Sequence, residues 1–154
     1  MSEKYNYFYD EYYQDMAKLV EIYKKIPNPH VVSVYRGSLP MGVHLSNALG
    51  CPMSIVKYQS RDGKDEKAEW ILNLIHDETL RPTARFFPHL IVVDDIYDTG
   101  KTFRAVLDLP EFDKNPMYSC MALFGNENDD KVFYLHEQLY RWIVFPWERV
   151  KGGM

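Results

Sequence analysis

One short stretch of the sequence gathers residues that could bind a phosphorylated sugar. Residues 90–102 read LIVVDDIYDTGKT, an apolar run followed by three aspartates and a turn: Asp94, Asp95, Asp98, Thr99, Gly100, Lys101 and Thr102. The N–H groups and hydroxyls of such a turn can hold a phosphate, and glycine lets the backbone approach it closely. Carboxylates instead bind sugar hydroxyls or a magnesium ion that holds phosphate oxygens.

Other chemistries fit this stretch less well. A Walker-type phosphate loop needs a glycine five residues before Gly100, where Asp95 stands. An aspartyl-phosphate enzyme needs a different spacing of aspartates and a longer chain. An acidic helix cap after a buried strand remains the structural alternative, although it requires only one aspartate.

The composition sets limits on the fold and its partners. With 154 residues, 46% of them hydrophobic, the chain is expected to form a single domain over residues 1–154. The net charge of −4 argues against a general affinity for nucleic acid. No apolar run approaches the ~20 residues of a membrane span. Cys51 and Cys120 show no metal-binding spacing, which predicts free thiols in a cytoplasmic protein.

Strand-like and helix-like patterns alternate along the chain. Helical spacing is found in residues 8–26, 39–49 and 99–109, and strand patterns in residues 31–35, 53–58, 70–75, 90–93, 117–124, 132–135 and 142–145. Gly50 is expected to cap the second helix. The alternation predicts an α/β fold with a mostly parallel sheet, in which ligands bind beyond the carboxyl ends of the strands. Both Arg36-Gly37-Ser38 and residues 94–102 are expected at such ends.

Three segments resemble one enzyme family. VVDDIYDTGKT resembles the phosphoribosyl-pyrophosphate motif of type I phosphoribosyltransferases, and VYRGSLPMGVHLSNALG resembles their pyrophosphate loop and following helix. WIVFPWE resembles a C-terminal segment of the bacterial xanthine-guanine, or 6-oxopurine, branch. The resemblance implies the family's fold: a mostly parallel central sheet flanked by helices, a lid loop and a small C-terminal hood. The charged residues 59–69 correspond to the lid.

The resemblance also implies roles for single residues. Asp94 and Asp95 would bind the ribose hydroxyls, and Asp95 and Glu148 would hold Mg²⁺. Asp98 would lie beside the imidazole nitrogens of a purine and help to move a proton. The remaining contacts would come from Thr99, Gly100, Lys101 and Thr102 for the 5-phosphate, Arg36 and Gly37 for pyrophosphate, and Asn126, Trp142 and Ile143 for the base.

Two aromatic residues near the C-terminus have alternative interpretations. Trp142 could stack on the base or pack in the core, whereas Trp147 is expected to pack in the core.

The sequence departs from the 6-oxopurine pattern on the side that binds the base. The lysine that donates to the 6-oxo group is replaced at or near Asn126, and Lys131 is a more distant substitute. An asparagine can donate or accept, so it could also read an amino group. Val144 stands where the bacterial enzyme has an acid, and Ser38 where its pyrophosphate loop has a second glycine.

The resemblance implies a homo-oligomeric purine phosphoribosyltransferase, a dimer or tetramer. Its substrates would be phosphoribosyl pyrophosphate and a free base, namely xanthine, guanine or hypoxanthine. One alternative is a regulatory protein of the same fold that binds a nucleotide or phosphoribosyl pyrophosphate without catalysis. Another is a transferase for a pyrimidine or a modified base.

Overall fold

The elements of this computed structural model follow the predicted alternation. The structure describes residues 3–35, 37–58, 67–77, 88–115, 117–126, 132–139 and 141–148. The helices are α1 (Tyr9–Tyr23), α2 (Leu39–Leu49), α3 (Lys101–Leu107), α4 (Pro110–Lys114) and the 3₁₀ turn η2 (Pro146–Glu148). The strands are β1 (Lys4–Asn6), β2 (Pro29–Tyr35), β3 (Met53–Lys57), β4 (Glu69–Leu72), β5 (His89–Tyr97), β6 (Tyr118–Gly125), β7 (Val132–Glu137) and β8 (Trp142–Val144).

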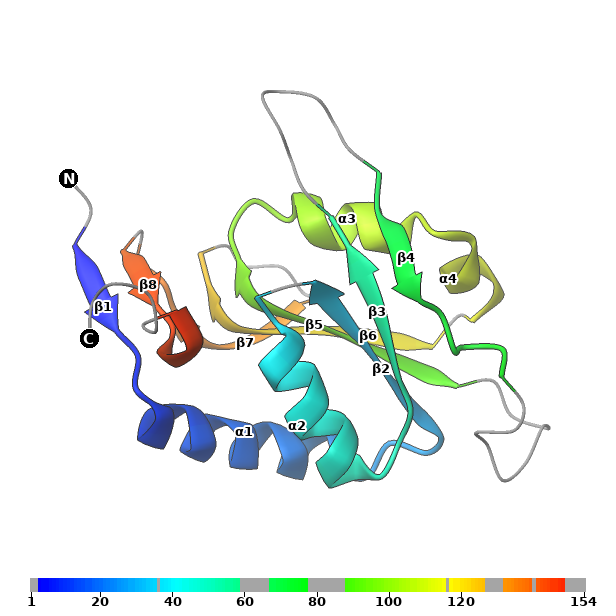
Figure 1. Ribbon diagram of the computed structural model, residues 1–154, viewed down its shortest axis with the longest axis horizontal. Coiled ribbons are helices and arrows are strands. Elements are labelled where there is room, and N and C mark those ends of the chain that lie inside the picture. The colour runs from blue at the N-terminus through cyan, green and yellow to red at the C-terminus, as the bar shows by residue number, and fades with distance from the viewer. Residues whose placement is uncertain are drawn as a thin grey trace.

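A six-stranded sheet in the order β4-β3-β2-β5-β6-β7 forms the centre of the molecule (Figure 1). Its strand pairs are parallel, except that β4 runs antiparallel to β3. Helices α1 and α2 cover one face, and α3 and α4 cover the other (Figure 1). The predicted α/β fold with a mostly parallel sheet is therefore confirmed.

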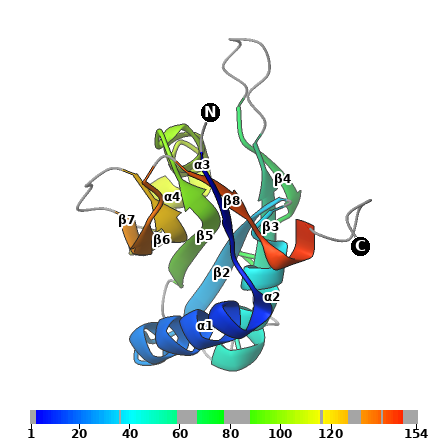
Figure 2. The ribbon, with the colours of Figure 1, turned by 90° about the vertical axis from the view of Figure 1, so that its left-hand side faces the viewer.

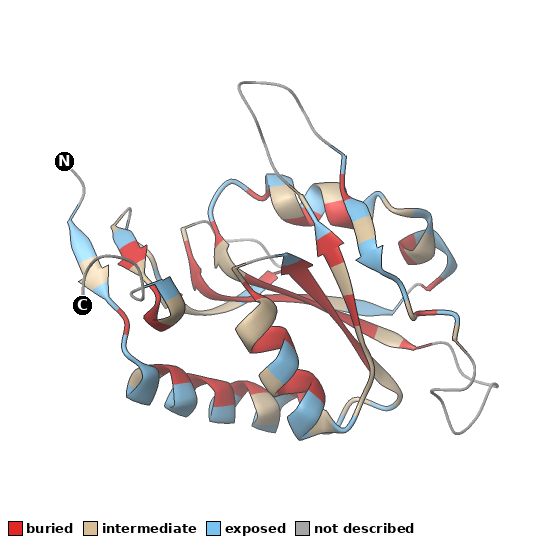
Figure 3. Cartoon of the chain, in the orientation of Figure 1, coloured by how far each residue is buried: buried red, intermediate tan, exposed pale blue. Residues whose placement is uncertain are grey.

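Alternating side chains of the central strands fill a core on each face of the sheet. Val31, Ile91 and Met121 pack with the residues of α1 and α2. Val32 and Val92 face the other way and pack with Phe103 of α3. Figure 3 shows the resulting burial of β2, β5 and β6 along most of their length. Burial on both faces explains why these strands read as continuous apolar runs.

Several element boundaries differ from the sequence-based expectation. Strand β5 does not end at Val93 but continues to Tyr97, so Asp94 and Asp95 lie within the strand. The strand expected over residues 70–75 is confined to Glu69–Leu72. Helix α3 ends at Leu107, and the proline at position 110 begins the separate short helix α4. The second helix was predicted with its observed bounds, and Gly50 caps it with φ of 62°.

A small two-stranded hood joins the two ends of the chain. Strands β1 and β8 lie side by side in parallel (Figure 2), with Tyr5 paired to Ile143. Its core contact is aromatic, because the buried ring of Phe145 lies 6.0 Å from that of Phe124 on β6. Trp147 stacks on Phe145 at 5.1 Å, which confirms its predicted packing role.

The structure also bears on membrane-spanning helices and on the state of the two cysteines. Within the described ranges, no helix has the length and apolar character needed to cross a bilayer. Cys120 is buried and Cys51 is partly buried, and neither cysteine forms a disulfide.

Candidate active site

Three polar residues form a row across the carboxyl ends of β5, β6 and β7. The last paired residues of these strands are Tyr97, Gly125 and Glu137, which lie in register. The next residue of each strand is therefore brought to the same edge: Asp98, Asn126 and Gln138. The Asn126 side-chain nitrogen Nδ2 donates to Asp98 Oδ1 and to Gln138 Oε1, both at 2.7 Å.

The structure brings the acidic stretch and the predicted pyrophosphate loop together. A Cβ placed on Gly37 would overlap Oδ2 of Asp95 and lie 3.2 Å from its Cγ. The loop backbone therefore passes directly against the Asp95 carboxylate. Such a close approach needs a residue without a side chain, which explains glycine at position 37.

Ser38 holds that loop against the sheet. Its buried hydroxyl lies 2.6 Å from the carbonyl oxygen of Val34 and 3.0 Å from that of Val93. The Ser33 hydroxyl in turn donates to the Ser38 carbonyl oxygen at 2.9 Å. The serine that replaces the second glycine of the family pattern thus connects β2, β5 and the loop.

The adjacent aspartates form a site in which negative charge is unfavourable. Burial raises the pKa of Asp94 well above its usual range, and the neighbouring Asp95 carboxylate raises it further. Burial also raises the pKa of Asp95. The Asp94 carboxylate accepts a hydrogen bond from the Asp95 backbone N–H at 2.9 Å. A cation or a sugar hydroxyl at this position would relieve the unfavourable charge.

Glu148 from the hood lies within the electrostatic field of this pair. Its pKa is raised by burial, and the Asp95 charge contributes to the increase. The Phe145 backbone N–H donates to the Glu148 carboxylate at 3.4 Å. In the described part of the chain, no group of three or more histidine, cysteine, aspartate or glutamate side chains is arranged to hold a metal. Asp95 and Glu148 nevertheless carry the oxygen ligands that Mg²⁺ prefers, and this ion usually keeps water and phosphate oxygens in the rest of its shell.

The turn after β5 is shaped by a glycine in the left-handed region. Gly100 has φ of 83°, and a Cβ there would come within 3.1 Å of the Tyr97 hydroxyl oxygen. Helix α3 begins at Lys101 immediately afterwards. Arg104 Nη1 donates to the Thr99 carbonyl oxygen at 3.3 Å, which fixes the turn from the helix side. Thr99 and Thr102 accordingly flank a compact turn at the edge of the sheet.

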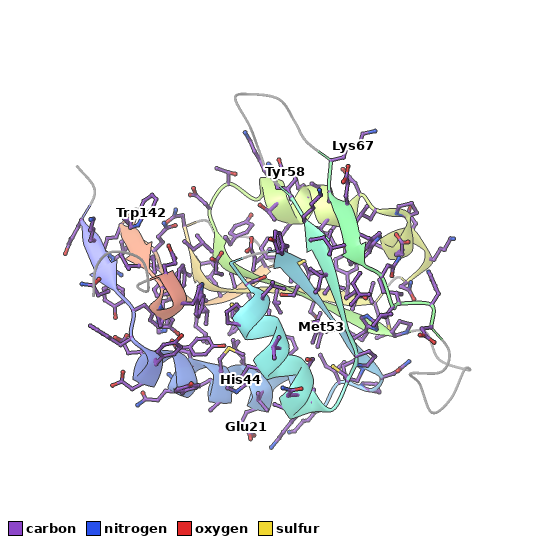
Figure 4. All side chains as sticks on the ribbon, in the orientation of Figure 1. Glu21, His44, Met53, Tyr58, Lys67 and Trp142 are labelled. Carbon is purple, nitrogen blue, oxygen red and sulfur yellow. The ribbon has the colours of Figure 1, made fainter. Side chains whose placement is uncertain are left out.

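A cavity of about 820 Å³ opens beside this turn. Its lining includes Lys101 and Arg104 of α3, together with Tyr58 and Lys67. Figure 4 shows Tyr58 and Lys67 at the two ends of the segment that joins β3 to β4. Three cations thus lie near the turn of a protein whose net charge is −4.

The predicted base-binding residues occupy different positions in the hood. Trp142 is 60% exposed on β8 (Figure 4), so it is not a core aromatic and its ring is accessible. Ile143 is buried and pairs with Tyr5. Sequence reasoning missed Gln138 and Arg141, which connect the polar row to the hood. The predicted strand ended at residue 135, and the register that brings Gln138 to the edge is visible only in the sheet.

The segment around Arg141 secures the far end of that row. Gln138 Nε2 donates to the Arg141 carbonyl oxygen at 3.0 Å, and Arg141 Nε donates back to the Gln138 carbonyl oxygen at 3.1 Å. The Arg141 guanidinium also lies 4.4 Å from the ring centroid of Tyr5 on β1. Contacts with the hood therefore hold this end of the polar row in place.

Some predicted elements lie outside the described residues. These are Arg36 of the pyrophosphate loop, residues 59–66 of the lid, and Lys131, the substitute for the missing lysine.

Comparison with known proteins agrees with this geometry. Residues 9–111 match the model of the phosphoribosyl transferase domain. A purine phosphoribosyltransferase from Pyrococcus horikoshii Ot3 matches with a TM-score of 0.73 and 25% identity, over 95% of this chain and 94% of that one.

Two further structures share the fold. A xanthine-guanine-hypoxanthine phosphoribosyltransferase from Helicobacter pylori has a TM-score of 0.69 and 21% identity, over 96% of this chain and 94% of that one. A hypothetical protein from Neisseria gonorrhoeae with bound ppGpp has a TM-score of 0.68 and 19% identity, over 98% of this chain and 92% of that one. Adenine and orotate phosphoribosyltransferases match as well, so likeness of fold does not select a base.

Proposed function

This chain belongs to the phosphoribosyl transferase domain family, and on that premise we propose that it is a purine phosphoribosyltransferase of nucleotide salvage. It transfers the ribose 5-phosphate of phosphoribosyl pyrophosphate to a free purine base and releases pyrophosphate. Xanthine, guanine and hypoxanthine are the candidates suggested by the WIVFPWE segment. The observation that carries this proposal is the meeting of Gly37, Asp95 and the Asp98–Thr102 turn at one edge of the sheet.

Two kinds of group bind the sugar phosphate: carboxylates that accept hydrogen bonds from its hydroxyls, and N–H and hydroxyl groups that donate to its phosphate. Asp94 and Asp95 accept hydrogen bonds from the ribose hydroxyls, which provide donors without adding negative charge. The turn from Thr99 to Thr102 holds the 5-phosphate through N–H and hydroxyl groups. Gly37, and Arg36 beside it, bind the pyrophosphate.

Magnesium suits the oxygen ligands of the site. Asp95 and Glu148 would hold the ion, which, when bound, would neutralise charge on the pyrophosphate leaving group. Both carboxyl groups have a raised pKa because of burial, and a cation would stabilise their ionised forms.

The transfer itself requires one bond to form, one to break and one proton to move. The N9 nitrogen of the base bonds to the anomeric carbon as the bond from that carbon to the pyrophosphate oxygen breaks. The proton on N7 passes to the Asp98 carboxylate. Positive charge develops on the ribose ring during this step, and the Asp94 and Asp95 carboxylates stabilise it electrostatically.

The hood contributes to binding of the base. The exposed Trp142 ring stacks on the purine plane. Backbone groups at Ile143 and the side chain of Asn126 contact its edge. Residues 59–69, which correspond to the family's lid and lie mostly outside the described residues, would exclude water that could otherwise hydrolyse the sugar phosphate.

A panel of free bases tests the proposal. Each base is mixed with phosphoribosyl pyrophosphate, Mg²⁺ and the protein, and nucleotide and pyrophosphate are measured together. We expect equal amounts of both products with at least one purine. Turnover with a pyrimidine alone would replace the purine assignment. Absence of turnover with every base, while a nucleotide still binds, would favour a regulatory protein.

The Neisseria gonorrhoeae structure with bound ppGpp motivates a second candidate function, nucleotide-dependent regulation. The same edge could bind a guanine nucleotide through its phosphates without catalysing transfer. Calorimetric titration with ppGpp, repeated with saturating phosphoribosyl pyrophosphate, tests this directly. Competition between the two ligands would indicate that ppGpp binds at the proposed substrate site, and absence of binding would exclude regulation by ppGpp.

The cytoplasmic location and the dimeric or tetrameric state remain predictions. Sedimentation of the purified protein at several concentrations measures the second. A homo-oligomer is expected, and a monomer at all concentrations would contradict it.

A further inference from the structure

An acidic residue lies on the buried face of the first helix. The buried side chains of α1 follow a helical spacing: Tyr12, Asp15, Met16, Leu19 and Tyr23. Asp15 is only 4% exposed, and the transfer reaction proposed above does not use it. A carboxylate buried in this way is costly unless it is hydrogen-bonded or paired. Its partners therefore indicate its role.

The carboxylate of Asp15 connects the hood, the central sheet and α1. The Tyr7 hydroxyl, which follows hood strand β1, donates to Oδ2. His136 Nε2, on β7 of the central sheet, lies 2.8 Å from the same oxygen. Lys18 Nζ, on α1 itself, lies 3.9 Å from the other oxygen, Oδ1. Burial raises the pKa of Tyr7, and the hydrogen bond to Asp15 raises it further, so this hydroxyl keeps its proton and remains a donor.

Tyr7 links this carboxylate to the hood. Its backbone N–H donates to the Val144 carbonyl oxygen at 3.0 Å, which extends the pairing of β1 with β8 by one residue. Its buried ring lies edge-on to two aromatic rings, 5.1 Å from Phe124 of the sheet and 5.9 Å from Phe145 of the hood. Figure 2 shows β1 running beside β8 and then into α1. Tyr7 therefore lies where the hood, the sheet and the helix meet.

His136 links the same carboxylate to the layer next to the polar row. The Gln138 backbone N–H donates to the Gly125 carbonyl oxygen at 2.8 Å, so the strand ladder continues one residue beyond β7. Residues two apart in a strand point to the same face, so His136 and Gln138 share one face of the sheet. The His136 ring also packs on Phe124, with centroids 5.3 Å apart. The contact with Asp15 thus lies one side-chain repeat before the polar row.

We propose that Asp15 is a positioning residue, which holds the hood over the carboxyl ends of β6 and β7 and thereby sets the affinity for the base. The proposal rests on the transferase function, in which the hood supplies Trp142 to the base and Glu148 to Mg²⁺. Asp15 acts through Tyr7 and His136 rather than by contact with a substrate.

The expected effect is on binding rather than on the chemical step. When a hydrogen bond of Asp15 is removed, the hood is correctly placed in only a fraction of the molecules, and apparent affinity falls by that fraction. Saturating substrates stabilise the correctly placed hood, so kcat is retained. Loss of one hydrogen bond to a charged group corresponds to a change of roughly tenfold.

Tyr7→Phe is the decisive variant, because it removes one hydroxyl and keeps the packing of the ring. The most active purine of the panel is used as the substrate. We expect its KM, and the Mg²⁺ concentration that gives half the maximal rate, to rise roughly tenfold, with kcat within about threefold of the wild type. An unchanged KM in this variant would overturn the proposal, whether or not the variant is less stable.

Substitutions of Asp15 test the same contact from the other side. Asp15→Ala should raise KM as Tyr7→Phe does, and the two together should add little because they disturb one shared contact. Asp15→Asn keeps an acceptor oxygen and should recover most of the wild-type affinity. Tyr13→Phe, at an exposed position on α1, is the matched control and should keep the wild-type KM. Full additivity of the two changes would contradict a shared role.

Hydrogen exchange measures the position of the hood without turnover. The N–H groups of Trp142 and Tyr7 donate to the carbonyl oxygens of Glu3, at 2.7 Å, and Val144, at 3.0 Å, so both amides report opening of the hood. In Tyr7→Phe the amides of residues 7 and 142 should exchange roughly tenfold faster. The amide of Val92, in the centre of β5, should keep its wild-type rate. Unchanged exchange in the hood, or equal acceleration everywhere, would contradict the positioning role.

The two measurements separate this inference from the proposed function. If no base reacts but exchange in the hood responds to Tyr7→Phe, the transferase proposal alone fails. If the wild-type protein turns over and the variant keeps both its KM and its exchange rates, the role of Asp15 alone is refuted.

Discussion

Substitution of Gly37 by alanine tests whether the pyrophosphate loop and Asp95 form one site. The new Cβ would overlap Asp95 Oδ2, so the carboxylate must move. The Ile96 backbone N–H donates to the other carboxylate oxygen, Oδ1, at 2.8 Å and opposes that movement. The expected result is displacement of Asp95 by roughly an ångström rather than a change of fold.

The functional cost follows from that displacement. A misplacement of roughly an ångström at a reacting site costs on the order of 100-fold in rate. That factor corresponds to about 2.7 kcal/mol of transition-state stabilisation. Gly37 does not have positive φ, so alanine adds no backbone strain. Disturbing one hydrogen bond should lower the free energy of unfolding by only about 1 kcal/mol.

Gly50→Ala is the control, because it is expected to lower stability without changing catalysis. Gly50 has φ of 62° and nothing lies within 4 Å of an added Cβ, so the cost is backbone strain alone. We expect a loss of about 1–2 kcal/mol in stability, or about 2–4 °C in Tm per kcal/mol, with unchanged kcat/KM. Steady-state kinetics and thermal unfolding are measured for both variants. Wild-type kcat/KM in Gly37→Ala would refute the contact between loop and carboxylate.

Three further substitutions address the acidic stretch and the loop. Asp94→Asn combined with Asp95→Asn should abolish binding of phosphoribosyl pyrophosphate, measured by calorimetry. Because burial raises the pKa of both groups, their ionisation opposes folding, and wild-type stability falls as pH rises through the folded-state pKa values. The double variant should lack this fall in stability. A Tm of the double variant at pH 7 below that of the wild type would contradict the reasoning. Asp98→Ala should lower kcat about 10²–10⁴-fold with little change in KM, and a raised KM at full kcat would exclude its proton-transfer role. Ser38→Ala removes the hydroxyl that lies 2.6 Å and 3.0 Å from two backbone carbonyl oxygens. It should lower the free energy of unfolding, measured by chemical denaturation, by about 1–3 kcal/mol. An unchanged denaturation midpoint would show that the loop is held by other contacts.

The sequence predicted the fold because its strands and helices have strong, distinct patterns. Strands β2 and β5 are apolar on both faces, and the 39–49 helix has a glycine cap, so these elements could be placed from local signals. The end of β5 could not be placed from local signals. Hydrogen bonds to β6 extend the strand through Ile96 and Tyr97, and such pairing depends on residues far away in the chain.

The candidate site was predictable where function depends on a contiguous motif. The residues from Asp94 to Thr102 are adjacent in sequence, and the structure keeps them at one edge. The row from Asp98 through Asn126 to Gln138 depends instead on the register of three strands. Strand β1 was missed for a related reason, because three residues carry little pattern until they pair with β8.

A crystal structure with phosphoribosyl pyrophosphate and Mg²⁺ tests the central claim most directly. We predict that the ribose hydroxyls lie on Asp94 and Asp95, with the 5-phosphate enclosed by the turn from Thr99 to Thr102. Binding of the ligand at any other surface, with that turn empty, would contradict the account.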